Sequence, residues 1–256
     1  MKTNSLITRR KAIVTRLSGG GGLVLSGCSR ELPPTYGNIL RTGDVLTYTA
    51  HRTLLPGQSL AREYSRKDIS SFSAIGTTNP AEPGARFYEA THGPVYERLR
   101  EYALTEWRLS IEGRVDQPGS YSLADLKRFH MRTQITRHTC EEGWSAIGEW
   151  TGVPLSLLLE VAGVLPSACF VSFYQFDDIA DSIDMVDALH PQTILAYGMN
   201  GRDLSIPHGA PVRLRVEKQL GYKSVKYLRR IVVTNEFDDL GKSGLIQNGW
   251  SWYAGI

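Results

Sequence analysis

Residues 137–145 and 150–155 read Arg137-His138-Thr139-Cys140-Glu141-Glu142-Gly143-Trp144-Ser145 and Trp150-Thr151-Gly152-Val153-Pro154-Leu155. The residues from Thr133 to Thr139 favour an extended chain and predict a strand that ends at Cys140. Binding and catalytic residues often lie where a strand passes into a loop. Cys140 is therefore placed where functional residues are common.

Outward from these stretches, the sequence predicts a β-rich domain with short helices. Apolar and polar residues alternate from Trp107 to Val115, as on a half-buried strand. Ser122 followed by Asp125 has the pattern of a helix start, for a helix that ends near residue 128. Further strands are expected at residues 170–173, 212–216 and 227–233, and a loop at residues 141–150. The expected fold class is α+β, a single mixed, β-rich domain over residues 106–256.

A second helix is expected directly after the Cys140 region. Pro154 suits a helix start, Gly163 suits its end, and one apolar face would contain Leu155, Leu158, Leu159 and Ala162. The sequence has no series of strands and helices with a glycine-rich nucleotide loop, so a Rossmann fold is not supported.

Residues 28–105 are expected to wrap around this core as an N-terminal segment. From Pro33 to Glu106 the chain is rich in turn formers, and the pairs Pro56-Gly57, Asn79-Pro80 and Pro83-Gly84 mark loops. No long regular element is predicted here.

The positive charge of the chain is concentrated at its N-terminus. The formal net charge is +3, and residues 1–27 contain no acid and five cations, Lys2, Arg9, Arg10, Lys11 and Arg16. Without these five charges the rest of the chain has a net charge of −2. The body of the protein is therefore not expected to bind nucleic acid.

Residues 1–27 are expected to form an export signal. The pair Arg9-Arg10, followed by a weakly apolar stretch too short to span a bilayer permanently, resembles a twin-arginine signal. Leu25-Ser26-Gly27-Cys28 resembles the processing site of bacterial lipoproteins, so Cys28 is a possible site of a lipid anchor. The expected location is the periplasm, or the extracytoplasmic face of a membrane through that anchor.

The chain contains three cysteines, Cys28, Cys140 and Cys169. No CxxC pair is present, so zinc-ribbon and thioredoxin-like sites have no support. Cys169 lies in an apolar, strand-like run and is expected to be a buried thiol. A disulfide between Cys140 and Cys169 is the alternative that an oxidising compartment leaves open.

Two further stretches, His208-Gly209-Ala210-Pro211-Val212-Arg213-Leu214 and Gly221-Tyr222-Lys223-Ser224-Val225-Lys226-Tyr227-Leu228, follow in order. Together with the Cys140 region they resemble the oxidoreductase molybdopterin-binding domain of sulfite-oxidase-like enzymes, and more closely that of exported methionine-sulfoxide reductase catalytic subunits. The resemblance covers Glu106 to Phe237. It implies a sulfite-oxidase-type fold and a molybdenum-molybdopterin cofactor in its mononucleotide form.

Residue roles follow from this resemblance. Cys140 would be the metal ligand, and Cys140, Glu142 and His138 are the candidate catalytic residues. The candidate cofactor contacts are Thr77, Asn79, Tyr88, Glu89, Arg137, His208, Arg213, Ser224, Val225 and Lys226. Independently of the resemblance, closely spaced Arg213, Lys223 and Lys226 would suit a phosphate, which requires fixed positive donors.

The sequence departs from the family pattern at two positions. Relatives usually carry Asn where this chain has His208, and Asn-Gly-Thr where it has Ile75-Gly76-Thr77. Ile75 cannot donate or accept a hydrogen bond through its side chain. The contact would pass either to Thr77 or Asn79, or to Tyr88 and Glu89.

The expected reaction is oxygen-atom transfer, with electrons exchanged with a haem- or quinone-linked membrane partner. Glu141 and Glu142 directly follow the expected ligand and disfavour an anionic substrate, so reduction of a neutral S-oxide or N-oxide is preferred. One alternative is a sulfite-type oxidase. Another is a cofactor-binding or electron-relay lipoprotein without turnover.

Overall fold

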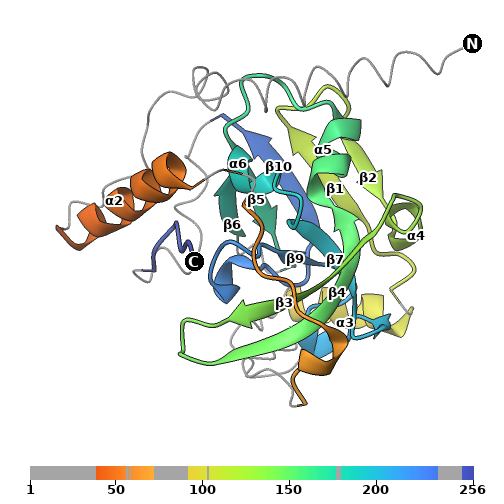
Figure 1. The fold of residues 1–256 in the computed structure, drawn as a ribbon. Helices are drawn as coiled ribbons and strands as arrows, with labels where there is room; N and C mark the ends of the chain where they lie inside the picture. The colour runs from red at the N-terminus through yellow and green to blue at the C-terminus, as the bar shows by residue number, and fades with distance from the viewer. Residues whose placement is uncertain are drawn as a thin grey trace, which may run out of the picture.

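The computed structural model describes residues 39–55, 57, 59–71, 92–102, 104–176, 180–235 and 250–256. The expected export signal and Cys28 lie outside these residues. Within the described part, two five-stranded sheets and several short helices form a β-rich α+β fold (Figure 1). This is the fold class that the sequence predicted.

The first sheet has the strand order β2-β1-β10-β5-β6. Its strands are β1 (Leu109–Gly113), β2 (Gly119–Tyr121), β5 (Phe170–Tyr174), β6 (Ala180–Asp184) and β10 (Arg230–Thr234). Strands β1 and β10 are parallel, whereas the other neighbours are antiparallel. We call this the scaffold sheet because the residues that resemble the cofactor site lie mainly on and around the other sheet.

The second sheet, which we call the site sheet, is antiparallel and has the order β3-β4-β7-β8, with β9 paired to β7. Its strands are β3 (Arg132–Thr139), β4 (Ser145–Pro154), β7 (Ile194–Met199), β8 (Arg202–Asp203) and β9 (Arg213–Arg215). The register shifts between Thr151 and Gly152, where an added Cβ on Gly152 would collide with the backbone of Leu195. A glycine is therefore required where β4 approaches β7.

The helices are short, apart from the first described one. They are α2 (Ile39–Leu54), α3 (His92–Glu101), α4 (Leu123–Leu126), α5 (Leu155–Ala162) and α6 (Met185–Ala188), with 3-10 turns η2 (Arg66–Asp68), η3 (Ile206–His208) and η4 (Gly221–Lys223). Among the described helices, none is both long and apolar enough to cross a membrane.

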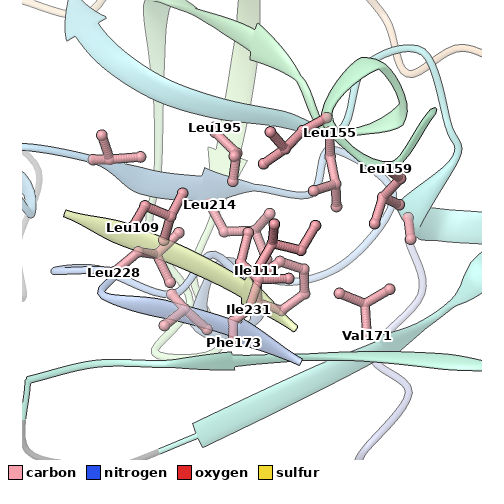
Figure 2. Close-up of a cluster of buried hydrophobic side chains, with 14 of the residues drawn as sticks. Leu109, Ile111, Leu155, Leu159, Val171, Phe173, Leu195, Leu214, Leu228 and Ile231 are labelled. Atoms are coloured by element: carbon pink, nitrogen blue, oxygen red, sulfur yellow. The ribbon is translucent and has the colours of Figure 1, made fainter. Parts of the chain in front are cut away.

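The hydrophobic core contains residues of both sheets and α5. Figure 2 labels Leu109, Ile111, Leu155, Leu159, Val171, Phe173, Leu195, Leu214, Leu228 and Ile231, all of which belong to one buried cluster. Burial of a side chain of this size contributes roughly 1.5–3 kcal/mol. Leu214, the middle residue of β9, is part of this core. Its burial anchors the strand that carries Arg213 and Arg215.

Several local predictions are confirmed. The Ser122 hydroxyl accepts from the Asp125 backbone N–H, and the Asp125 carboxylate accepts from the Ser122 backbone N–H at 3.0 Å, which caps α4. Helix α5 ends at Ala162, and the next residue, Gly163, has a φ of 68° in the left-handed region. The expected loop at residues 141–150 is wrong, because β4 already begins at Ser145 and pairs with β3 as a hairpin.

The N-terminal segment contains regular structure that the sequence did not predict. Helix α2 covers 16 residues, and residues near Tyr64 lie along the edge of β3, where the Tyr64 N–H donates to Ile135 O at 2.8 Å. The predicted free thiol at Cys169 is also wrong, because this buried cysteine is disulfide-bonded. Cys140 is a free cysteine, so it does not form the alternative disulfide with Cys169.

Candidate active site around Cys140

Cys140 lies at the tip of the β3–β4 hairpin. Its N–H donates to Trp144 O at 2.9 Å, and the Gly143 N–H donates to Cys140 O at 3.2 Å, which closes the turn. Gly143 has a φ of 89°, a conformation that favours glycine. The turn therefore fixes the backbone of Cys140 and leaves its side chain partly exposed.

Two carboxylates surround the thiol. Cys140 Sγ lies 3.3 Å from Glu141 Oε2 and 3.8 Å from Glu142 Oε2. Burial, and then the negative charge of Glu141 and Glu142, raises the pKa of Cys140 to about 11. Without a bound cation, the Cys140 thiol is therefore protonated at neutral pH. A cation that binds the sulfur would displace this proton. Trp144 Nε1 donates to Glu142 Oε2 at 2.9 Å and so fixes this carboxylate.

His138 continues the same face of β3, since every second residue of a strand points to the same side. Its Nδ1 accepts a hydrogen bond from Arg215 Nη1, and its ring lies 5.7 Å from the ring of Trp144. Burial and the charges of Arg215 and Arg213 hold the pKa of His138 far below its usual range. The imidazole is therefore neutral and carries its proton on Nε2, which faces the backbone of Gly221, where an added Cβ would collide with it.

Two arginines of β9 lie against one tryptophan of β4. Arg213 Cζ lies 5.2 Å and Arg215 Cζ 4.4 Å from the centroid of Trp150, and all three side chains are buried. Their guanidinium groups differ in their partners. Arg215 forms a bidentate ion pair with Glu217, at 2.8 and 3.1 Å.

Arg213 is held by carbonyl oxygens. It donates to Ser224 O at 2.8 Å and to His208 O at 3.2 Å, with a longer contact to Leu214 O at 3.5 Å. Burial and the neighbouring charge of Arg215 lower the pKa of Arg213 to about 9. Arg213 is thus a fixed, buried cation whose charge the carbonyl groups stabilise only partly.

Lys226 and His208 lie beside Arg213. An added Cβ on Gly209 would lie 2.8 Å from Lys226 Cβ, which shows how closely the turn after η3 approaches this lysine. Lys226 Nζ donates to Pro207 O at 2.9 Å, and burial together with Arg213 lowers the pKa of Lys226 to about 7. His208 Nδ1 lies 2.8 Å from Ser205 Oγ, and its buried Nε2 has no hydrogen-bond partner among the described residues.

The other predicted residues are placed differently. Ser224 is buried, with its Oγ accepting from the Val216 N–H at 3.3 Å, and Val225 packs in the core while its carbonyl accepts from the Leu214 N–H. Arg137 lies on the exposed face of β3, with its Cζ 5.5 Å from the Tyr64 ring, and is not brought together with Arg213. The predicted contacts Thr77, Asn79, Tyr88 and Glu89, and the departure at Ile75, lie outside the described residues.

Lys223 does not belong to this cation group. Its Nζ donates to Asp181 Oδ1 and, at 2.8 Å, to Ser182 O, and its side chain is fully buried. The expectation that Lys223 helps to hold a phosphate is therefore wrong. The turn η4 directs Lys223 toward β6, away from the direction taken by Lys226.

Sequence reasoning missed the polar network beneath the site. Gln134 Nε2 donates to Glu217 Oε1 at 3.0 Å, and Glu217 in turn holds Arg215, which contacts His138. The signal was present in the sequence, because Arg213, Arg215 and Glu217 occupy alternate positions on an extended segment and so share one face.

A family model described as the oxidoreductase molybdopterin binding domain matches residues 92–239, more than half of the chain. The chain belongs to this family. The match begins 14 residues before the core domain expected from the sequence and includes helix α3. The Cys140 hairpin, the two arginines of β9 and the turn η4 all lie within it.

Similar proteins carry related names. A putative protein-methionine-sulfoxide reductase subunit, YedZ1, from Azospira oryzae is 38% identical over 160 residues, which cover 62% of this chain and 60% of the relative. The protein-methionine-sulfoxide reductase catalytic subunit MsrP of Pseudomonas syringae is 31% identical over 168 residues, 59% of this chain and 50% of the relative. The chain thus spans between half and 60% of the length of these two relatives.

Solved structures also include a similar chain. The sulfane dehydrogenase SoxCD from Paracoccus pantotrophus is 28% identical, with a TM-score of 0.49, over 52% of this chain and 39% of that chain.

The described residues fit the cofactor of this family. A pterin phosphate is an anion, and two cations lie side by side here: Arg213, which is buried, and Lys226, which is partly exposed. The buried Nε2 of His208 has no hydrogen-bond partner within the described part of the chain, and it offers a further hydrogen-bonding group beside them. Cys140 would supply one partly exposed sulfur as the protein ligand of the metal.

Proposed function

We propose that this protein is a molybdenum-pterin oxidoreductase that transfers an oxygen atom and reduces a neutral S-oxide of the methionine-sulfoxide class. The observation that carries the proposal is the partly exposed Cys140 thiol at a hairpin tip, with Glu141 and Glu142 within 4 Å of the sulfur. The family match supports the cofactor class. The names of the relatives support the substrate class.

The chain's own residues would bind and position the cofactor. Cys140 would be the protein ligand of the metal, and Arg213, Lys226 and His208 would hold the phosphate of the pterin. When bound, the cofactor supplies two-electron oxygen-atom transfer at the metal. The protein contributes a fixed sulfur, buried positive charge and a neutral imidazole at His138.

The charges near Cys140 favour a neutral substrate. Glu141 and Glu142 are exposed, so a ligand that approaches the sulfur from solvent approaches two carboxylates. An anion such as sulfite would be repelled there, whereas a sulfoxide or an N-oxide carries no net charge. Glu141 Oε2 is the nearer of the two to Cys140 Sγ, and the Glu142 carboxylate is held beside the thiol by a hydrogen bond from Trp144.

The redox partner and the location are part of the proposal. We expect electrons to come from a haem- or quinone-linked membrane protein, and we expect the protein to act outside the cytoplasm after export by its N-terminal segment. The mononucleotide form of the pterin is likewise an expectation that rests on the family resemblance.

Paired activity assays test the proposed direction. Protein purified from a pterin-competent bacterium is given a reduced viologen with methionine sulfoxide, and separately sulfite with an artificial electron acceptor. We expect S-oxide reduction that Cys140→Ser abolishes and sulfite oxidation near background. In Glu141→Gln with Glu142→Gln, sulfite turnover should rise relative to S-oxide turnover. Sulfite oxidation that is faster than S-oxide reduction in the unchanged protein would contradict the proposal.

A further inference from the structure

The loop that follows β9 is bound to the last described residues of the chain. We call residues 250–256 the strap. The Leu220 N–H donates to Ala254 O at 2.8 Å, and the Ile256 N–H donates to Lys218 O at 3.0 Å. Gln219 and Gly255 form an antiparallel bridge between these bonds. The strap therefore pairs with the loop as a short additional strand.

Side chains extend this pairing toward η4. Tyr222 Oη donates to Ser251 O at 2.5 Å, and the Tyr222 ring packs edge-on against Trp250 at 5.0 Å between centroids. The Gln219 side-chain oxygen accepts from the Ala254 N–H at 3.2 Å. The strap thus contacts the loop on both sides of Leu220, just before the chain reaches Ser224 and Lys226.

Helix α2 packs on the other side of the strap. The Tyr253 ring lies 5.1 Å from the Tyr48 ring, its Oη lies 3.1 Å from His51 Nδ1, and Arg52 Cζ lies 4.8 Å from its centroid. In Figure 1, α2 lies beside the marked C-terminus, at the edge of the body. The strap is therefore enclosed between α2 and the loop.

One buried carboxylate joins α2 to the same loop. Asp187 Oδ2 accepts from Arg52 Nη2 at 2.7 Å and from Gln219 Nε2 at 2.5 Å. Arg52 also forms two hydrogen bonds with Asp184, at 2.9 Å each. A displacement of α2 would therefore remove support from Gln219 as well as from the strap.

The strap has its own hydrophobic cluster. Trp252 and Tyr253 pack with Tyr48 and Phe170 in a group that is separate from the main core between the two sheets. Trp252 also contacts the scaffold sheet, because its Nε1 donates to Ser182 Oγ on β6 at 2.7 Å. The strap is therefore held by contacts of its own, outside the main core.

We propose that the strap and α2 are positioning elements of the cofactor site. They hold residues 217–223 in one conformation and thereby fix Ser224 and Lys226 where the phosphate would bind. Ordering a loop before a ligand arrives removes an entropic cost from binding and slows release of the ligand. This inference rests on the proposed function, because it assumes that the pterin binds at Arg213 and Lys226.

The test compares cofactor release from purified, cofactor-loaded proteins. The variants are removal of residues 250–256 and Tyr222→Phe, which removes the hydroxyl that donates to Ser251 O and keeps the ring. Leu158→Ala is the matched control, because it destabilises the main core away from the strap. Bound molybdenum and the fluorescence of oxidised pterin are followed over time after gel filtration, and tryptic cleavage after Lys218 reports loosening of the loop.

We expect removal of the strap to accelerate pterin release at least tenfold, and Tyr222→Phe to accelerate it about threefold to tenfold, the range for one lost hydrogen bond. Cleavage after Lys218 should increase in both. Leu158→Ala should release pterin at the rate of the unchanged protein. Release from Tyr222→Phe no faster than from the control would overturn the proposal, even if the truncated chain does not fold. If the unchanged protein, purified in the same way, contains no pterin, the proposed function and this inference are overturned together.

Discussion

Lys223 and Lys226 lie three residues apart and have opposite surroundings. Lys223 is fully buried and contacts the carboxylate of Asp181, which lies on the scaffold sheet. Lys226 is beside Arg213 in the site, where its Nζ donates to the carbonyl of Pro207. The turn η4 therefore separates a lysine with a structural ion pair from a lysine whose pKa is lowered by burial and by the neighbouring charge of Arg213.

This difference shows how a single motif combines two tasks. The Lys223–Asp181 pair fixes the turn to β6, and the strap fixes it from outside. Arg213 and Lys226 then present positive charge from a rigid frame. A phosphate site needs both parts, because cations on a mobile loop would move apart by mutual repulsion.

The largest effect is expected from Lys223→Met. This change leaves Asp181 as a buried carboxylate without its cation, and such a loss costs about 3–5 kcal/mol of the free energy of unfolding. Urea unfolding measures it. The double variant Lys223→Met with Asp181→Leu should recover most of the loss, since no unpaired charge remains. A single variant within about 1 kcal/mol of the unchanged protein would mean that Lys223 is not a structural cation.

A different result is expected from Arg213→Gln. The pterin should bind about 10- to 100-fold more weakly, because a charge-assisted hydrogen bond contributes roughly 1.5–3 kcal/mol. The unfolding free energy of the cofactor-free protein should change less than in Lys223→Met, since removal of Arg213 also relieves repulsion from Arg215. Pterin content titrated by fluorescence measures the binding, with Arg128→Gln as an exposed control. Equal pterin affinity in both variants would place the phosphate elsewhere.

The smallest effect concerns pH and Lys226. The folded pKa of Lys226 is lowered to about 7, whereas that of the unfolded chain is near 10.5. Between these values the unfolded state binds more protons, so this residue makes the cofactor-free protein more stable as the pH rises, by at most roughly 1.4 kcal/mol per pH unit. Unfolding at pH 7 and pH 9 should show this gain in the unchanged protein and a smaller gain in Lys226→Met. Identical gains would mean that Lys226 is not held beside Arg213.

Local patterns predicted much of the fold. The capped start of α4, the glycine stop of α5 and the strand β5 follow from residues that are close in sequence. Helix α2 was missed, because its support comes from contacts with Asp184, Asp187 and Tyr253, which are more than 130 residues away. Its own sequence, with Gly43 and several threonines, gives little helix propensity.

In the candidate site, too, contacts between residues far apart in the chain were not predicted. Spacing alone grouped Arg213, Lys223 and Lys226 as phosphate donors, but the partner of Lys223 is Asp181, 42 residues earlier in the chain. Short-range sequence does not reveal which cation finds such a partner. The family resemblance identified Cys140 and Arg213 as candidates, and the alternation of residues 213–217 could have placed Arg215 and Glu217 on one face. The contact of Arg215 with His138, 77 residues apart in the chain, required the structure.

X-ray absorption at the molybdenum edge tests the central assignment, Cys140 as the metal ligand, most directly. Protein loaded with cofactor in a pterin-competent host is compared with Cys140→Ser, at equal pterin content. The assignment predicts one fewer sulfur around the metal in the variant than in the unchanged protein, because the pterin sulfurs remain and the cysteine sulfur is lost. An equal number of sulfur ligands in the two proteins would contradict it.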